Sequence, residues 1–328
     1  RREDVFQVCV VGNTCMHHLF LGISPASLVH APYTPAVSER LVLNAGDYGL
    51  AVQERAELIM LSDIAGYVGA DTCGCLLAIR QDQQEEISLM IDIGTNGEMV
   101  LGNRERMVTC STAAGPAFEG AKIECGMRGA AGAVDHVKYE DGKWNYTTVG
   151  NKPAVGLCGS GLIDLVAGLL DAGMLDENGV LRSGQEKQGV FILVPPERGG
   201  NERGVYLTQK DLGEVQLAKA AIAAGIQMLM ERLGITEDDI CSVYIAGAFG
   251  NYMDPVSAGK IGLLPATLVK KVKPVGNAAG EGAKIALVNE KEMLEMDELV
   301  RKIEFVELAA SADFQDHFID ELGFETGE

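Results

Sequence analysis

The chain of 328 residues is poor in basic and in aromatic side chains. It holds 27 Lys and Arg against 47 Asp and Glu, a formal net charge of −20, and only 5% of its residues are aromatic. Nucleic acids and anionic membranes are bound by basic faces, so this balance argues against both as partners. No apolar run is long enough for a membrane-spanning helix, and the N-terminus lacks the apolar core of a signal peptide. We therefore expect a cytoplasmic protein.

The sequence also lacks the cysteine spacing of metal and iron–sulfur sites. Its 8 cysteines are scattered, and the one close pair, Cys73 and Cys75, is not a C-x-x-C motif. Ferredoxin-type spacing is absent, so no iron–sulfur cluster is expected within this chain. We interpret the cysteines as buried free thiols in a reducing compartment. His17 and His18 are neighbours on a predicted helix, where they face different directions and make a poor metal site.

Apolar residues make up 47% of the chain, and its length suggests two domains or two lobes. Strand-like runs alternate with helical patterns, which predicts an α/β fold. The longest helix is expected from residue 208, with an apolar stripe facing the core. Further strands are expected at residues 5–11, 56–61, 106–110, 241–246 and 303–308, and further helices begin near residues 15, 70, 116, 156, 276 and 312. The small residues at 156–161 are interpreted as a packing feature, and residues 183–204 as a polar excursion.

The chain is organised around residues 87–102, which read as a buried strand, a polar turn and a second strand. Asp92 lies where the first strand leaves the core, and the turn is Gly94-Thr95-Asn96-Gly97. The two glycines allow positive φ and a close backbone approach. Such a turn presents backbone N–H groups to an anion such as phosphate, and a neighbouring carboxylate then requires a cation. Asp92 therefore points to Mg²⁺, held directly or through water. An ordinary β-hairpin is the simpler alternative.

Two pairs of segments in the chain resemble each other. Residues 8–12 match residues 243–247, each a buried strand ending in glycine, and residues 64–70 match residues 275–281, each a small-residue helix start. Their order is the same near both ends of the chain, with the hairpin between them. This order predicts a chain that runs from the tail of one α/β lobe through the whole of a second.

The arrangement resembles the acetate and sugar kinase/Hsp70/actin superfamily, in which two similar RNase H-like lobes clamp ATP. By resemblance, residues 92–97 match the second phosphate motif and residues 247–251 the adenosine motif. Residues 66–69 and 276–280 match the two connecting helices, which cross at the hinge. The implied fold is α/β with duplicated lobes and an incomplete first lobe. Residues 1–86 are then the C-terminal part of the first lobe, and residues 87–328 are the second.

Five blocks narrow the resemblance to the C-terminal part of reductive activators of corrinoid proteins. They are VGNTCMHHL at residues 11–19, IDIGTNGE at 91–98, STAAGPAFEG at 111–120, CGSGLID at 158–164 and AGAFGNY at 246–252. The resemblance implies ATP-dependent reduction of a Co(II) corrinoid to Co(I) on a partner protein of a methyltransferase or O-demethylase system. It implies ATP and Mg²⁺ as cofactors, and a homodimer is one expected assembly.

The same resemblance gives the site residues their roles. Asp92 is the catalytic carboxylate and organises Mg²⁺. Phosphate is held by the turn after it, that is by Gly94, Thr95, Asn96 and Gly97. Adenosine is lined by Gly247, Gly250 and Asn251. Glu98 and Glu119, the latter on the helix expected at Pro116, either orient water or are ordinary solvated or capping carboxylates.

The sequence departs from the family pattern in two ways. It has no iron–sulfur domain and no phosphate hairpin of the first lobe, so we expect it to be the C-terminal region of a longer protein. One alternative is a small-molecule kinase of the same superfamily, although the catalytic acid it needs in the first lobe is not seen. Another is a non-catalytic docking module with an acidic surface. A corrinoid-binding module is disfavoured because no D-x-H-x-x-G pattern occurs.

Overall fold

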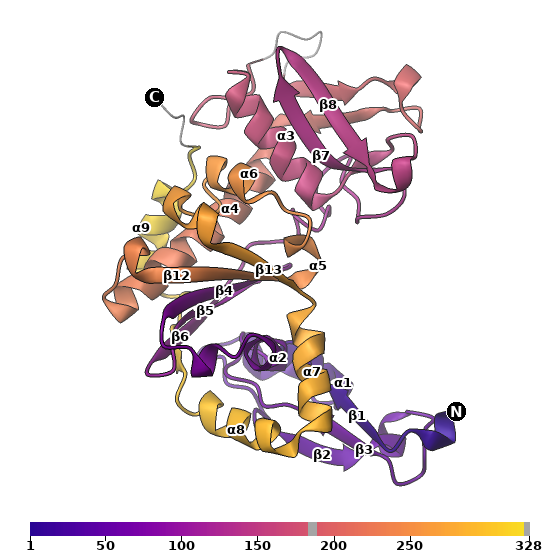
Figure 1. Cartoon of the computed structure of the whole chain (residues 1–328), viewed down its shortest axis with the longest axis vertical. Helices are drawn as coiled ribbons and strands as arrows, with labels where there is room; N and C mark the ends of the chain where they lie inside the picture. The colour runs from indigo at the N-terminus through magenta and orange to yellow at the C-terminus, as the bar shows by residue number, and fades with distance from the viewer. Residues whose placement is uncertain (183–188, 325–328) are drawn as a thin grey trace.

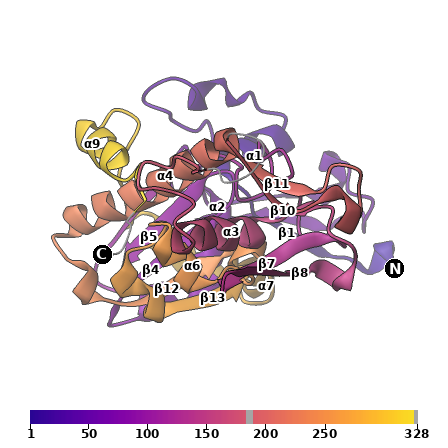
Figure 2. The same ribbon diagram turned by 90° about the horizontal axis from the view of Figure 1, so that it is seen from above.

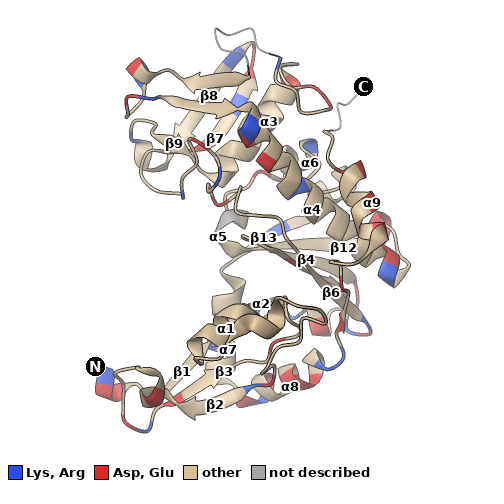
Figure 3. Ribbon diagram, turned by 180° about the vertical axis from the view of Figure 1, so that it is seen from behind, with Lys and Arg blue, Asp and Glu red and all other residues tan. Residues whose placement is uncertain are grey.

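The structure, a computed structural model, describes residues 1–182 and 189–324. The chain forms two α/β halves, with helices α2 (Ala70–Ile79) and α7 (Ala278–Val288) packed together between their sheets (Figure 1). Viewed from above, α3 and β7 lie nearest the viewer, over the larger sheet (Figure 2). In the view of Figure 3, Lys and Arg occur in both halves, interspersed with Asp and Glu.

The first half contains a three-stranded sheet of order β1-β3-β2, in which β3 runs parallel to β1 and antiparallel to β2. Its elements are β1 (Gln7–Val10), α1 (Thr14–Phe20), β2 (Leu41–Asn44) and β3 (Glu57–Met60). One buried cluster joins this half to α2, α7 and α8 (Glu290–Val300). Arg40 pairs with Asp297, and Arg80 with Glu292, so α8 is also held by charge. Helices α7 and α8, which come late in the sequence, therefore complete the hydrophobic core of the first half.

The second half contains a six-stranded sheet of order β13-β12-β4-β5-β6-β14. Its strands are β4 (Ile87–Ile93), β5 (Gly97–Gly102), β6 (Met107–Thr112), β12 (Ile240–Ala246), β13 (Val272–Gly276) and β14 (Glu304–Phe305). Strands β4, β12 and β13 are parallel, whereas β4, β5 and β6 form an antiparallel meander. The helices of this half are α4 (Gln209–Leu233), α5 (Gly247–Gly250), α6 (Pro255–Lys260) and α9 (Ala312–Asp320).

An outer subdomain follows β6 in the chain. It contains β7 (Ala133–Glu140), β8 (Lys143–Thr148), β9 (Gly156–Leu157), α3 (Gly159–Asp171), β10 (Val190–Val194) and β11 (Val205–Thr208). A Cβ at Gly161 would lie 2.2 Å from the carbonyl oxygen of Val134, so the small residues opening α3 serve close packing, as the sequence predicted. Short 3-10 helices complete the chain at η1 (Arg2–Asp4), η2 (Pro25–Leu28), η3 (Ala45–Tyr48), η4 (Gln81–Gln83), η5 (Val149–Asn151), η6 (Pro196–Arg198), η7 (Glu237–Asp239) and η8 (Ala266–Lys271).

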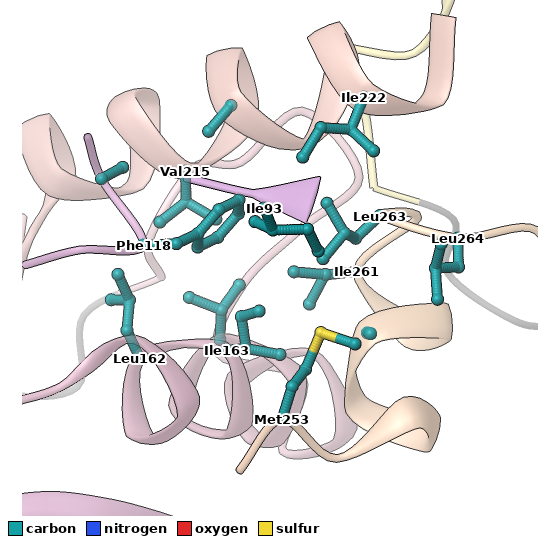
Figure 4. Packing of buried hydrophobic residues seen from close by; sticks show 14 of the residues in the cluster. Ile93, Phe118, Leu162, Ile163, Val215, Ile222, Met253, Ile261, Leu263 and Leu264 are labelled. Carbon is teal, nitrogen blue, oxygen red and sulfur yellow. The ribbon is translucent and has the colours of Figure 1, made fainter. Parts of the chain in front are cut away.

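Both ends of helix α4 are determined by residues of the local sequence. Thr208 and Asp211 form a capping box at its start, and Gly234 ends it in the left-handed conformation with φ +69°. Its apolar side chains face α3 across the largest core, where Ile93 lies between Val215, Ile163 and their neighbours (Figure 4). Every helix in the described parts of the chain is too short or too polar to cross a bilayer.

Several predictions from the sequence need correction. The helix expected at Pro116 is a run of turns, because Gly115 and Gly120 take positive φ and the buried Asp211 carboxylate accepts the Glu124 N–H. The strand expected over residues 303–308 shortens to β14, and part of the polar excursion forms β10; residues 183–188 of that excursion lie outside the described residues. Four cysteines are buried, but Cys15 and Cys241 are exposed, so the buried-thiol interpretation was too general.

Candidate functional site

The carboxyl ends of three parallel strands meet at one edge of the larger sheet. In the register of the sheet, Asp92 of β4 is the partner of Ala246 of β12, and Ala246 is the partner of Gly276 of β13. Ligands of open α/β sheets bind outside such carboxyl ends. The two predicted motifs, around Asp92 and Gly247, therefore lie side by side, as the resemblance implied.

Strand alternation decides which way Asp92 faces. Ile91 and Ile93 point into the core beneath α3 and α4, where Figure 4 shows Ile93, whereas Met90 packs into the cluster that contains α2. Because side chains alternate along a strand, Asp92 lies on the same face as Met90. The Cys75 thiol of α2 is 3.9 Å from Asp92 Oδ2. Asp92 thus faces the helices packed between the two halves.

Three carboxylates gather at this position. Glu98 of β5 is the register partner of Asp92, and Asp71, the second residue of α2, approaches both closely enough to alter their titration. Burial, reinforced by Asp71 and opposed by Cys75, raises the pKa of Asp92 to about 6. Burial, reinforced by Asp71 and Asp92, raises the pKa of Glu98 to about 8. Burial also raises the pKa of Asp71. The raised pKa values mean that the three carboxyl groups are difficult to ionise together.

The donor set fits Mg²⁺ bound together with an anionic ligand. Within residues 1–182 and 189–324, none of the three carboxylates pairs with Lys or Arg. Nor does that part of the chain contain a group of three His, Cys, Asp or Glu side chains that could hold a metal ion by itself. Mg²⁺ characteristically takes one or two protein carboxylates and completes its shell with water and substrate phosphates. A half-buried carboxylate with a raised pKa beside a backbone turn matches that pattern.

The turn after Asp92 differs from the prediction in its detail. Neither Gly94 nor Gly97 takes a positive φ. Gly97 is required for space, because a Cβ there would lie 2.8 Å from Thr112 Oγ1 and 3.2 Å from Ile222 Cγ1. The Thr95 hydroxyl is exposed and donates to Glu119 Oε2 at 3.1 Å, and the Thr95 carbonyl accepts the Gly115 N–H at 2.8 Å. Loop 113–120 thus covers one side of the turn and places Glu119 against it.

Asn96 and Glu98 are linked beside the turn. The Asn96 side chain forms a hydrogen bond with the Glu98 carboxyl group, and the Ser111 hydroxyl donates to Glu98 Oε1 at 3.4 Å. A phosphate contact by the Asn96 side chain would compete with this hydrogen bond. The sequence did not decide the roles of Glu98 and Glu119, and their positions in the structure differ. Glu98 is buried next to Asp92, whereas Glu119 lies at the outer side of the turn.

The second predicted motif closes the other side of the site. Gly247 takes φ +89°, and a Cβ there would lie 3.0 Å from Asp92 Oδ1, so only glycine lets this turn approach the carboxylate. Gly250 is buried, and a Cβ on it would lie 2.9 Å from the carbonyl oxygen of Ile245. Exposed Asn251 places its amide nitrogen 3.1 Å from the Cβ position of Gly276, just before α7. The motif therefore lies between Asp92 and the start of α7.

Asp71 is the member of the cluster that sequence reasoning missed. An acidic residue in the first turn of a helix is common because it suits the helix dipole, so its residue type carried no functional signal. The available clue was positional: Asp71 follows the small-residue helix start of the internal repeat, which the resemblance assigned to the hinge. Only the packing of α2 against the larger sheet brings it to Asp92.

The chain has two α/β halves with packed helices between them, and a carboxylate hairpin and a glycine turn lie at the strand ends. This arrangement defines the actin-like fold class. The family model described as "C-terminal domain of RACo the ASKHA domain" matches residues 86–328, and "RACo middle region" matches residues 1–84. The chain belongs to this RACo family. It is also similar, with a TM-score of 0.91 and 38% identity, to the solved "Reductive activator for corrinoid,iron-sulfur protein", over 99% of this chain and 53% of that one.

Two curated relatives support the assignment. The chain is 36% identical to "Corrinoid activation enzyme RamQ" of Eubacterium limosum, over 97% of this chain and 56% of the relative. It is 29% identical to "[Co(II) methylated amine-specific corrinoid protein] reductase" of Methanosarcina barkeri, over 85% of this chain and 54% of the relative. The chain therefore spans about half the length of the relatives it matches.

Proposed function

We propose that this chain is the nucleotide-binding part of an ATP-dependent activator that returns a Co(II) corrinoid on a partner protein to Co(I). The observation that carries the proposal is the juxtaposition of Asp92 and Gly247 at the carboxyl ends of β4 and β12, facing the helices between the halves. The similarity to a corrinoid activation enzyme over 97% of this chain supports the substrate class.

In the proposed site Asp92 holds Mg²⁺, directly or through water, and backbone groups from Gly94 to Gly97 contact phosphate, with Thr95 and Asn96 at its edge. Bound Mg²⁺ neutralises phosphate charge during hydrolysis. Asp71 and Glu98 flank Asp92: an ionised Asp71 carboxylate is available to accept a proton from an attacking water, and Glu98, protonated below about pH 8, is available to orient it. Gly247, Gly250 and Asn251 line the adenosine, and the two glycines let this turn pack against Asp92 and Ile245.

Residues 1–86 are proposed as the C-terminal part of the first lobe and residues 87–328 as the second. The parallel pair β1–β3 corresponds to β12–β13. On its other edge β12 pairs in parallel with β4, whereas β1 pairs with β3 alone among the described strands. By this symmetry, a first-lobe phosphate strand belongs beside β1. The iron–sulfur electron source of the resemblance is likewise proposed to lie outside residues 1–328.

ATP acts in this proposal by changing how the two halves sit about α2 and α7. A nucleotide can drive an unfavourable electron transfer only if its states differ in their affinity for two arrangements of the protein, or of its complex. The site touches both halves, since Asp71 belongs to α2 and Asp92 to β4. Closure around nucleotide would therefore change the surface offered to the corrinoid protein of a methyltransferase or O-demethylase system. A homodimer is the assembly that we propose to test by light scattering.

The test is titration of Mg²⁺–ATP and Mg²⁺–ADP into the chain by calorimetry, with Asp92→Asn alongside. We expect binding that depends on both Mg²⁺ and Asp92. Co(I) formation is then followed by visible absorption, using the full-length protein, a reductant, ATP and the Co(II) corrinoid partner. A phosphorylated small molecule in place of Co(I) would support the kinase alternative, and equal partner affinity with and without nucleotide would support the docking module.

A further inference from the structure

His17 forms a buried link to the helix that carries Asp71. His17 lies on α1, and its Nδ1 is 3.2 Å from Asp63 Oδ2, with only 6% and 3% of the two side chains exposed. The other oxygen of the same carboxylate, Asp63 Oδ1, accepts the backbone N–H of Ala70 at 2.9 Å. One carboxylate thus joins the histidine of α1 to the first residue of α2.

Asp63 takes the place of a missing helix cap. The N-cap of α2 is Gly69, which has no side chain to accept the free N–H groups of the first turn. Gly69 cannot be exchanged for a capping residue, because a Cβ there would lie 2.6 Å from the carbonyl oxygen of Gly12. The cap therefore comes from a different segment, and Asp63 must be oriented from outside the helix, which His17 does.

The position of this first turn sets the geometry of the carboxylate cluster. The Asp71 N–H donates to the carbonyl oxygen of Gly12 at 3.3 Å, next to the ring of His17, whose Cδ2 is 4.0 Å from the Cβ position of Gly12. The Asp71 carboxylate in turn acts on Asp92 and Glu98. A shift of the α2 start would therefore move Asp71 relative to Asp92.

The neighbouring histidine shows what a purely structural role looks like. His18 is also buried, but both of its ring nitrogens have partners outside α2: Nδ1 contacts the Thr14 carbonyl oxygen at 2.7 Å, and Nε2 accepts the Ala36 N–H at 2.9 Å. His17 Nε2 has no hydrogen-bond partner among the described residues. His17 is therefore tied to the protein through the Asp63 contact, whereas His18 fixes a loop.

We propose that His17 is a positioning residue for the nucleotide site: through Asp63 it fixes the start of α2 and thereby the placement of Asp71 beside Asp92. This inference rests on the proposed nucleotide function. Because Nδ1 faces a carboxylate, it carries the proton that is donated to Asp63. His17 touches neither Asp92 nor the turn after it in any hydrogen bond of the described chain, so its effect is exerted through Asp63 and α2.

The test uses two amide substitutions that separate the nitrogens of the ring. His17→Asn keeps a donor near the Nδ1 position, whereas His17→Gln places its amide near Nε2 and loses the bond to Asp63. Amide exchange over residues 64–76 is measured on the chain without nucleotide. We expect wild-type protection in His17→Asn and about tenfold faster exchange in His17→Gln. His18→Asn is the matched control, with a lower melting temperature but unchanged exchange over these residues.

Turnover supplies the second readout. In the full-length protein carrying His17→Gln, we expect kcat for ATP hydrolysis to fall about tenfold to a hundredfold with KM within about threefold, since Asp71 is misplaced while nucleotide contacts remain. His17→Asn should recover most of this activity. Exchange and kcat in His17→Gln equal to wild type would overturn the proposal, and so would equal losses in both variants. If wild type binds no Mg²⁺–nucleotide, the proposed function fails, and the exchange comparison still decides whether His17 fixes α2.

Discussion

Gly74 of α2 and Gly282 of α7 bring two helix backbones into direct contact. A Cβ on Gly282 would lie 1.8 Å from the carbonyl oxygen of Gly74, and a Cβ on Gly74 would lie 2.6 Å from the carbonyl oxygen of Ala279. Helices ordinarily pack 8–10 Å apart because side chains separate them. This contact removes that spacing, so the backbones of the two helices pack directly on each other.

The first prediction concerns this helix contact. Gly282→Ala should lower the free energy of unfolding by about 2–3 kcal/mol, because the methyl group has no space and the helices must separate. Gly213→Ala on α4 is the control, since a Cβ there meets no other atom within 4 Å. That change should be neutral or should stabilise the chain by about 0.5–1 kcal/mol. Urea unfolding measures the free energy of unfolding of both variants. Equal stability of the two would show that the contact between α2 and α7 does not limit the size of residue 282.

The second prediction concerns Asp92. Asp92→Asn should weaken Mg²⁺–ATP binding by at least about tenfold, or about 1.4 kcal/mol, and should make the remaining affinity independent of Mg²⁺. Without nucleotide the variant should melt no lower than wild type at pH 8, because one negative charge of the partly desolvated carboxylate cluster is gone. Asp47→Asn, at an exposed site in η3, is the control. An unchanged Mg²⁺ dependence in Asp92→Asn would exclude Asp92 as the ligand.

The third prediction concerns pH. Burial, Asp71 and Asp92 raise the pKa of Glu98 from 4.5 to about 8 in the folded chain, so the folded state binds its proton more tightly than the unfolded state. The stability from this group is complete below about pH 4.5 and is lost as pH rises through about 8. Between pH 6.5 and 8.5 the stability should fall, by at most about 1.4 kcal/mol per pH unit.

Glu98→Gln provides the comparison for this pH effect. The amide keeps the shape of the protonated side chain but cannot ionise, so the melting temperature of the variant should vary less between pH 6.5 and 8.5. Thermal scans without Mg²⁺ measure the difference. Parallel curves for wild type and variant would show that Glu98 does not titrate in this range.

The fourth prediction concerns Asn251. This exposed side chain lies beside Gly276, the last residue of β13 before α7, next to the glycine turn. Asn251→Ala should weaken ADP and ATP binding equally, about fivefold or 1 kcal/mol, by removing a hydrogen-bonding group from the adenosine side. In contrast to Asp92→Asn, the effect should be the same with and without Mg²⁺. A loss seen only with Mg²⁺ would place Asn251 on the phosphate side instead.

The sequence was sufficient for the parts of the site that depend on strand ends. Asp92 lies near the carboxyl end of one buried apolar strand and Gly247 follows another, and parallel strands bring such ends to one edge of a sheet. It was insufficient where the position depends on packing between distant segments. Asp71 reaches the cluster only because α2 lies against α7 and the larger sheet. The helix expected at Pro116 is replaced by turns because Asp211, far along the chain, binds the Glu124 N–H.

The packing of α7 and α8 on the first half also determines when that half can be completed during synthesis. Its apolar surface is covered by residues 278–300, which follow residue 84 by almost two hundred positions. At a translation rate of about 5–20 residues per second, that interval is about 10–40 seconds. During this time the sheet of β1, β2 and β3 leaves the ribosome without its covering helices. The sheet of β1, β2 and β3 is thus completed only after residues 278–300 have been made.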